Sequence, residues 1–431
     1  MQTTFTAEQL ATPRIAEANS ILRKCVHCGF CTATCPTYAL LGDELDSPRG
    51  RIYLIKNMLE KGEAASTETV KHLDRCLSCL SCMTTCPSGV NYMHLVDEAR
   101  AHVEETYRRP LFDRLMRDVL ALTMPRPALF RLSLLAAKLV SPLAPVASSF
   151  GVNRVAALLN LVPKRMPAPE RFGRPGIYAA EGEKRGRVAL LMGCVQSVLD
   201  PGINAATIRL ITRLGYEVVV SGEESCCGSL THHMGKEQDA LARARRSVDQ
   251  WTKADVEAVI ITASGCGTTI KDYGHMLRLE SAYAEKAKAI SAKAKDVTEF
   301  LTGLDLPPSN KNMRLAYHSA CSMQHGQKIK TEPLKLLRNA GFDVLEVPEG
   351  HLCCGSAGTY NILQPEIAAR LRDRKVANIE SLEPEAIATG NIGCITQIGL
   401  GTGIPILHTI ELLDWAYGGP RPTQLPADDR G

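Results

Sequence analysis

Two cysteine runs constrain this chain more than any other feature of its sequence. Residues 25–36 read Cys-Val-His-Cys-Gly-Phe-Cys-Thr-Ala-Thr-Cys-Pro, and residues 76–87 read Cys-Leu-Ser-Cys-Leu-Ser-Cys-Met-Thr-Thr-Cys-Pro. Both follow the pattern C-x2-C-x2-C-x3-C-P. Three thiolates at this spacing wrap a tight loop around three corners of an iron–sulfur cube, and in chains with two such runs the fourth cysteine ligates the other cluster. The proline after each fourth cysteine has no N–H and a restricted φ, which helps to turn the chain away from the cluster.

The doubled run therefore predicts two [4Fe–4S] clusters that exchange their fourth ligands. The expected ligands of the first cluster are Cys25, Cys28, Cys31 and Cys86, and those of the second are Cys76, Cys79, Cys82 and Cys35. Zinc is the alternative metal, but it usually takes two separated C-x2-C pairs, which this pattern fits poorly. His27 lies between two ligands, and we interpret it as a bystander because four thiolates are already available for each cluster.

The sixteen cysteines of the chain are clustered, which indicates metal binding in a reducing compartment and not disulfides. Residues 1–21 show no basic start followed by an apolar core, so no signal peptide is visible.

The formal charge of +4 leaves out the clusters. Each oxidised cube with four thiolates carries about two negative charges, which brings the protein near neutrality. Because there is no aromatic-rich basic patch either, we expect no nucleic-acid partner.

Residues 1–108 are predicted to form a helical ferredoxin domain. The segment between the two runs, residues 36–75, is long for a compact ferredoxin built from short strands. Residues 49–61 carry apolar side chains at helical spacing after the start signal Ser47-Pro48, and residues 7–22 and 91–107 are helical in pattern. Three arginines are candidates to offset cluster charge, with solvated surface positions as the equally open alternative: Arg49, Arg51 and Arg75.

Residues 109–185 are predicted to be a proline-rich helical connector and linker. Their longest uncharged run, residues 140–153, contains two prolines. A membrane-spanning helix needs about 20 consecutive apolar residues, and this run is shorter, so we do not expect a span. The apolar stretches fit a packed connector or a surface that docks a partner, and direct contact with lipid stays open as the alternative.

Residues 186–310 and 311–431 are two copies of one unit. Each copy begins with an arginine seven residues before a cysteine, and a helix and a short strand then lead to Cys-Cys-Gly. The spacing from the first cysteine to the pair is the same in both copies, and another helix and strand lead to a final lone cysteine. The cysteines are Cys194, Cys226, Cys227 and Cys266 in the first unit and Cys321, Cys353, Cys354 and Cys394 in the second.

The alternation of strands and helices predicts an α/β unit with a largely parallel sheet, and an α+β multidomain architecture for the whole chain. In such sheets functional groups gather on the loops that leave the carboxyl ends of the strands. All eight cysteines of the repeat follow predicted strands, so we expect them to converge on one end of the domain. Buried cysteines can also pack as small apolar residues, but adjacent cysteines followed by glycine at matched spacing favour metal binding or redox use.

The repeat resembles the cysteine-rich "CCG" domain of heterodisulfide-reductase-like proteins. A helical ferredoxin domain followed by two CCG units is similar to the iron–sulfur subunits of respiratory flavin dehydrogenases. Within that group the chain resembles the glycolate oxidase (glycolate dehydrogenase) iron–sulfur subunits, through residues 25–38, 41–55, 262–267 and 351–360. The likeness covers nearly the whole chain and is weakest over residues 110–185.

The resemblance implies a complex with two flavoprotein subunits, one of which binds FAD and oxidises glycolate to glyoxylate. This chain would pass the electrons toward a membrane quinone, would carry no catalytic acid or base, and would associate peripherally with the cytoplasmic face of the cell membrane. The sequence has no strand–GxGxxG–helix fingerprint, which agrees with FAD being on the partners only. Iron–sulfur subunits of D-lactate or anaerobic glycerol-3-phosphate dehydrogenases are the close alternatives.

The chain departs from the fuller CCG pattern in one respect. That pattern ends in C-x2-C, whereas each unit here ends in a single cysteine and offers four cysteines where heterodisulfide-reducing relatives can offer five. A self-contained disulfide reductase and a metal-stabilised scaffold without redox traffic are therefore the more distant hypotheses.

The first unit supplies the candidate third cluster, because Gly265 and Gly267 flank its last cysteine. Its ligands would be Cys194, Cys226, Cys227 and Cys266. The four cysteines of the second unit are the other candidate set. Three histidines near that set are interpreted as local hydrogen-bonding groups: His318, His325 and His351.

Overall fold

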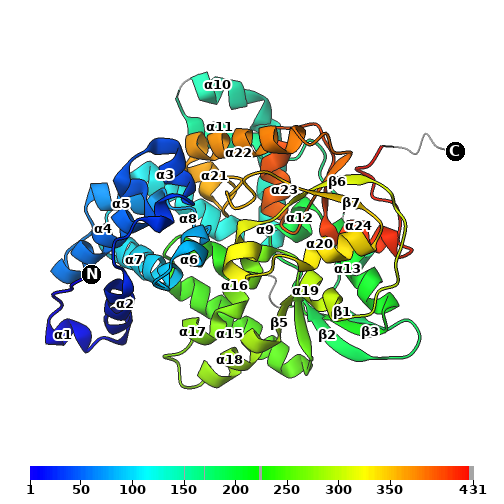
Figure 1. Cartoon of the computed structure of the whole chain (residues 1–431), viewed down its shortest axis with the longest axis horizontal. Helices are drawn as coiled ribbons and strands as arrows, with labels where there is room; N and C mark the ends of the chain where they lie inside the picture. Colours follow the sequence, from blue (N-terminus) through cyan, green and yellow to red (C-terminus); the bar gives the residue numbers. More distant parts are fainter. Residues whose placement is uncertain (150, 169, 223–225, 427–431) are drawn as a thin grey trace.

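The computed structural model describes residues 1–149, 151–168, 170–222 and 226–426. A helical domain drawn in blue lies beside two α/β units drawn from green to red (Figure 1). Residues 1–108 are helical, as the sequence predicts. Their elements are α1 (Ala7–Leu10), α2 (Pro13–Lys24), η1 (Phe30–Thr32), α3 (Pro36–Leu41), η2 (Glu44–Asp46), α4 (Pro48–Lys61), α5 (Thr67–Asp74), α6 (Ser81–Thr85) and α7 (Tyr92–Thr106).

Helix α4 shows why these residues are helical. The Ser47 side chain accepts a hydrogen bond from the Gly50 N–H at 3.0 Å, and Pro48 occupies the first turn, where its missing N–H has no cost. Gly62 ends the helix in the left-handed conformation, with φ 63°. The apolar face of α4 then packs with α2, α5 and α7 in one core, which also contains thiols of the two cysteine runs.

The predicted connector is helical and packs against both α/β units. Its elements are α8 (Leu111–Thr123), α9 (Pro127–Val140), η3 (Ser141–Leu143), α10 (Ala144–Ser149), α11 (Asn153–Asn160) and η4 (Arg171–Gly173). Leu120 and Phe130 share a core cluster with Val198 of the first unit and Ile362 of the second. The connector therefore contributes buried surface to both units, while much of its other face is solvent-exposed.

One helical stretch of the described chain, Pro127–Ser149, is long and apolar enough to cross a membrane by length and composition. Its most apolar window has a mean hydropathy of 1.5, and 17% of that window is buried. The expectation of no span rests on the uncharged run of residues 140–153. The apolar helical stretch begins earlier, at Pro127, and includes the charged residues Arg131 and Lys138. One such helix is weak evidence for a span, because core helices and signal sequences meet the same criteria.

Each repeat unit contains a parallel sheet. The first has the strand order β1-β3-β2-β4-β5, in which only the β1–β3 pair is antiparallel, and the second has the all-parallel order β7-β6-β8-β9. The strands are β1 (Gly176–Tyr178), β2 (Gly186–Leu190), β3 (Tyr216–Val220), β4 (Ala258–Ile261), β5 (Ala294–Asp296), β6 (Arg314–His318), β7 (Asp343–Glu346), β8 (Ala386–Thr389) and β9 (Ile406–His408). Strand β1 comes from the segment predicted to be linker.

Helices from both units lie between the two sheets. Contacts between α13 and α24 and between α19 and α20 join the units, and one core cluster runs from β2 through these helices to β6. Helix α16 of the first unit also packs against η5 of the second. The helices are α12 (Gln196–Leu199), α13 (Gly202–Arg213), α14 (Ser229–His233), α15 (Glu237–Ala254), α16 (Ser264–Lys271), α17 (Tyr273–Met276), α18 (Ala284–Lys293), α19 (Val297–Thr302), η5 (Ser322–Gln327), α20 (Glu332–Asn339), α21 (Tyr360–Leu363), α22 (Pro365–Glu380), α23 (Ile392–Gly399) and α24 (Thr409–Ala416).

Candidate functional site

The four predicted ligands of the first cluster line one cavity. Cys25, Cys28 and Cys31 come from the loop around η1, and Cys86 follows α6 of the other run. Cys28 is exposed, whereas Cys25 is buried. Four thiols around one cavity are the donor set that a [4Fe–4S] cluster requires, and one of them, Cys86, comes from the second run.

The predicted ligands of the second cluster are buried together. Burial raises the pKa of the Cys82 thiol, and the neighbouring thiols of Cys79, Cys76 and Cys35 raise it further. Thiols that share a buried space in this way become stable thiolates only when a positively charged group lies among them. An iron–sulfur cluster is such a group, so these four residues also fit the predicted cofactor.

The backbone of the two runs repeats the same unusual conformation. His27 and Gly29 have φ values of 55° and 85°, and Ser78 and Leu80, at the same places in the second run, have 50° and 62°. Left-handed residues alternating with ordinary ones turn successive N–H groups to one side, which forms an anion-binding nest of the kind found at iron–sulfur sites. His27 therefore contributes to the loop through its backbone, which agrees with its interpretation as a bystander.

Arg51 is the arginine that lies next to the buried thiols. It is fully buried, and its guanidinium contacts Cys35 Sγ at 3.9 Å and Asp46 at 3.2 Å. Burial by itself raises the pKa of Cys76, but the positive charges of Arg51 and Arg100 outweigh it, so this pKa lies below its ordinary value. Arg51 is thus placed to stabilise negative charge at the second cluster.

The other two candidate arginines have different environments. Arg75 donates to the buried carboxylate of Asp46 at 2.7 Å, and this carboxylate also bonds to His72 Nδ1 at 2.9 Å. Arg49 is largely exposed and pairs with Glu44. It also lines the cavity of the first cysteine loop, where its guanidinium lies 3.4 Å from the His27 carbonyl oxygen.

The eight cysteines of the repeat all follow the carboxyl ends of strands, as the sequence predicts. In the second unit the Cys321 and Cys353 sulfurs lie 3.7 Å apart, and the Cys354 and Cys394 sulfurs 3.5 Å apart. The first unit pairs its thiols in the same order: Cys194 with Cys226, and Cys227 with Cys266. Hydrogen bonding to a neighbouring thiol, together with burial, raises the pKa of Cys194, Cys227, Cys321 and Cys354, so these four thiols are neutral in the absence of a metal.

The glycine after each cysteine pair is required by close packing. Gly228 and Gly355 have φ values of 84° and 91°. A Cβ at Gly228 would lie 2.9 Å from the Ala240 carbonyl oxygen of α15, and one at Gly355 would lie 2.5 Å from that of Ala368 in α22. The glycines therefore let the cysteine loops lie directly against the following helices.

The second cysteine run packs against the second repeat unit. Cys79 shares an apolar cluster with Cys353 and Tyr360, and the Tyr360 hydroxyl donates to the Arg75 carbonyl at 3.0 Å. Burial raises the pKa of Cys79, and the nearby Cys321 thiol raises it further. No sequence motif indicates this contact, because its partners lie in different domains, far apart along the chain.

The three histidines of the second unit have different roles. His325 bonds to the Thr84 hydroxyl at 2.8 Å and to the His351 carbonyl at 3.2 Å, so it is a local hydrogen-bonding group, as predicted. His318 is buried and neither ring nitrogen has a hydrogen-bond partner in the described structure. The interpretation of His318 as a hydrogen-bonding group is therefore not supported by its surroundings. Burial lowers its pKa to about 3, so the ring is neutral at physiological pH.

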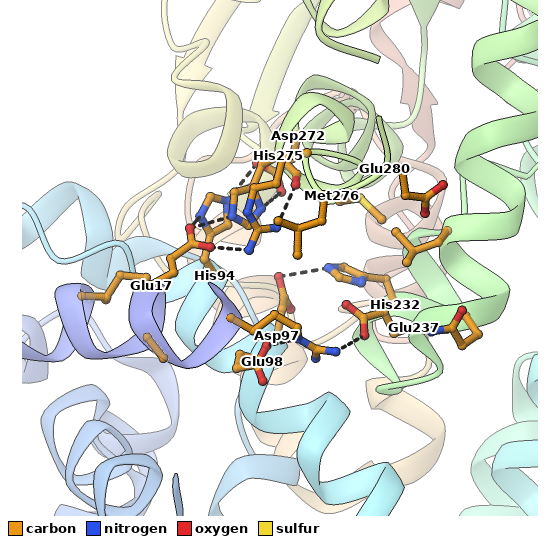
Figure 2. A pocket seen from close by; sticks show the side chains of 17 residues that line it. Glu17, His94, Asp97, Glu98, His232, Glu237, Asp272, His275, Met276 and Glu280 are labelled. Carbon is orange, nitrogen blue, oxygen red and sulfur yellow. Dashed lines mark hydrogen bonds and ion pairs between the residues drawn. The ribbon is translucent and has the colours of Figure 1, made fainter. Parts of the chain in front are cut away.

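A cavity lined by charged groups lies between the ferredoxin domain and the first unit (Figure 2). The rings of His94 on α7 and His275 on α17 stack with centroids 3.4 Å apart. Glu17 lies 2.7 Å from His275 Nε2, and Asp272 lies 2.9 Å from His94 Nε2. Sequence reasoning missed these residues because they come from separate elements and form no motif.

Comparisons with known proteins agree with the two-part organisation. A family profile described as "4Fe-4S dicluster domain" matches residues 24–90, and one described as "Cysteine-rich domain" matches residues 188–271 and 315–399. The described fold is also similar to a crystal structure of a hypothetical protein from Helicobacter pylori, with a TM-score of 0.54 and 10% identity over 96% of this chain and 74% of that one. That likeness concerns the fold alone.

Curated relatives match over nearly the full length. The "Glycolate oxidase iron-sulfur subunit" of Escherichia coli K12 is 44% identical over 96% of this chain and 99% of its own length. The "Probable glycolate oxidase iron-sulfur subunit" of Bacillus subtilis 168 is 32% identical over 92% of this chain and 94% of its own. "Lactate utilization protein A" of Bacillus licheniformis is 28% identical over 53% of this chain and 99% of its own length.

Proposed function

The chain belongs to the family of glycolate oxidase iron–sulfur subunits, and from this premise we propose that it is the electron-transfer subunit of a flavin-dependent glycolate dehydrogenase complex. Two flavoprotein subunits, one carrying FAD, would oxidise glycolate to glyoxylate. This chain would receive the electrons and pass them toward membrane quinone. Iron–sulfur clusters, when bound, supply one-electron steps between a flavin and the next acceptor.

The observation that carries the proposal is a continuous series of cysteines from the surface into the second repeat unit. Cys28 is exposed at one end of the series. Cys82 belongs to the buried second set but also lines the cavity of the first. Cys79 of the second set packs against Cys353. The thiols of the two cysteine runs, placed in this order, would hold two redox groups close to one another, which short-range electron transfer requires.

The surface beside Cys28 is the proposed contact with a flavoprotein. Val26 and Phe30 flank this cysteine and are 67% and 63% exposed. Large apolar side chains with this exposure are typical of protein–protein contacts. A flavoprotein bound there would lie next to the first cluster, while the bulk of the domain excludes water from the second.

Peripheral binding to the cytoplasmic face of the membrane is also part of the proposal. The exposed apolar side chains of α9 and α10 support it, and the basic Arg126 and Lys138 are exposed near them. Anionic lipid headgroups attract such basic side chains, while the apolar ones enter the interface.

The test combines subunit dissection with the Cys79→Ala variant. The isolated chain, purified anaerobically, should contain iron and acid-labile sulfide and should not oxidise glycolate. Co-expressed with the flavoprotein subunits, it should support glycolate-dependent quinone reduction. In the Cys79→Ala complex, glycolate should still reduce the flavin, but quinone reduction should be lost. Zinc in place of iron, or glycolate oxidation by the isolated chain, would contradict the proposal.

Lactate is the second candidate substrate of the complex, because a relative named for lactate utilization matches more than half of this chain. Comparison of glycolate with D-lactate as reductants of the assembled complex separates the two.

A third cluster on Cys194, Cys226, Cys227 and Cys266 stays a prediction. Iron in excess of about eight atoms per chain, lost from a Cys266→Ser variant, would support it.

A further inference from the structure

Two buried polar side chains in the second unit have no hydrogen-bond partner. His318, the last residue of β6, is 1% exposed, and both of its ring nitrogens are unpartnered in the described structure. Thr389 lies opposite it on β8 and is fully buried, and its hydroxyl is also without a partner there. A buried polar group left unpaired destabilises the folded state, so two adjacent ones indicate that a group binds between them.

The thiols of Cys354 and Cys394 lie next to His318. Their sulfurs are 3.5 Å apart. A nitrogen of His318 and the two sulfurs all lie within 4.8 Å of one another, and all three residues are buried. A tetrahedral zinc ion with Zn–S bonds of about 2.3 Å separates two thiolates by roughly 3.8 Å. The three donor atoms are thus spaced for a single ion.

The first unit shows that the fold itself does not require this histidine. Arg187 and Cys194 of the first unit correspond to Arg314 and Cys321 of the second, so Leu191 corresponds to His318. Leu191 is buried in an apolar cluster. A leucine therefore fills the same place at the end of the central strand when no donor is needed there.

We propose that His318, Cys354 and Cys394 bind a single thiophilic divalent metal ion, zinc, within the second repeat unit. Binding replaces two thiol protons, which are released, and the two thiolates balance the charge of the ion, so the buried site is neutral overall. The neutral imidazole supplies the third donor. A neutral oxygen ligand such as water would complete the four-coordinate shell.

This site is additional to the clusters of the ferredoxin domain and does not depend on the proposed function. The expected role of the ion is structural, since it joins the loop after β7, the end of β6 and α23 directly behind the cysteines that contact the second cysteine run. His318 would thereby position Cys353 against Cys79 without touching any substrate.

The experiment measures metal content in the full chain purified anaerobically with its clusters. The wild type should contain about one zinc per chain in addition to iron. His318→Leu, which introduces the residue of the first unit, should lose this zinc and keep its iron. Cys266→Ser, which changes the first-unit counterpart of Cys394, should leave the zinc in place.

X-ray absorption at the zinc edge of the wild type provides a test that does not depend on any variant folding. The expected shell has sulfur at about 2.3 Å and nitrogen at about 2.0–2.1 Å. Three outcomes would overturn the proposal: no zinc in the wild type, zinc retained by His318→Leu, or a shell of sulfur alone. Iron bound by the second unit in place of zinc would overturn it equally.

Discussion

At the scale of single residues, Arg51 places a buried positive charge beside the predicted ligands of the second cluster. Its guanidinium is fully buried and bonds to Asp46, the Thr37 hydroxyl and the His72 carbonyl, so its orientation is fixed. Water does not screen this charge, unlike that of an exposed arginine. A positive charge next to a cluster favours its reduced, more negative form.

Arg51→Gln should therefore lower the reduction potential of the second cluster. A unit charge about 6 Å away at an effective dielectric constant of about 20 corresponds to a shift on the order of 100 mV. A redox titration followed by paramagnetic resonance measures it. Arg51→Lys keeps the charge and should keep most of the potential, although it loses hydrogen bonds. Arg49→Gln, at a partly exposed position beside the first cysteine loop, should change the potential of the second cluster little, and an equal shift in this control would refute the explanation.

The exchange of fourth ligands makes a second prediction at this scale. Cys86→Ala should remove the cluster of the first run, because Cys86 lines the cavity of Cys25, Cys28 and Cys31. Cys35→Ala should remove the cluster of the second run instead. Paramagnetic resonance of the two variants distinguishes the clusters by their signals. If each variant lost the cluster of its own run, the exchange would be wrong.

At the scale of elements, the exposed face of α9 and α10 lacks a partner in the described chain. Leu139 on α9 is 84% exposed, and Leu143 and Val146 follow it on the surface. The opposite side of α9 is buried through Phe130 and Leu134, so the helix has one face for the core and one for a contact.

Leu139→Glu combined with Leu143→Glu should weaken binding to vesicles of anionic phospholipids by about tenfold or more, because burial of each leucine contributes about 1.5–3 kcal/mol. Cosedimentation measures the effect. The thermal stability of the variant should stay unchanged, since both side chains are exposed. Leu400→Glu, at an exposed position of the second unit, is the control. Unchanged vesicle binding with loss of complex assembly would assign this face to a protein partner.

At the scale of the whole molecule, the charged groups that line the cavity of Figure 2 connect the ferredoxin domain to the first unit. Burial by itself lowers the pKa of His94, but Asp272 and Glu17 outweigh it and hold the pKa above its ordinary value of 6.5. Burial raises the pKa of Asp272, but hydrogen bonds from His275 and His94 outweigh it and hold the pKa below 3.8. The domains are therefore held together by groups whose charges change with pH.

The direction of each pKa shift determines the pH range in which that group stabilises the folded state. The contribution of His94 is complete below its unfolded pKa near 6.5 and is lost as the pH rises through its higher folded pKa. The contribution of Asp272 is complete above 3.8 and is lost as the pH falls through its lower folded pKa. The unfolding temperature should thus fall as the pH rises above 6.5. His94→Gln should reduce this slope, to which His232 beside Asp97 also contributes, whereas His102→Gln, which replaces a ring bonded to a backbone carbonyl, should keep it.

Much of the local structure could be predicted from the sequence. The start of α4 at Ser47-Pro48 and the glycine-ended cysteine loops depend on a few adjacent residues, and the structure confirms them. Strands β5 and β9 escaped prediction because they are short and lie beyond the cysteine motifs. His318 was interpreted as a hydrogen-bonding group because a sequence does not show which polar atoms a buried residue meets.

By itself, the sequence determined the donor atoms and the repeated framework that carries them, because ligand spacing within a loop and the alternation of strands and helices are local properties. Only the tertiary structure decided which of these groups meet. It brought Cys79 to Cys353, His94 to His275, and His318 to Cys354 and Cys394. Such contacts result from the packing of whole elements, and the free energy of that packing is spread over many apolar residues that carry no motif.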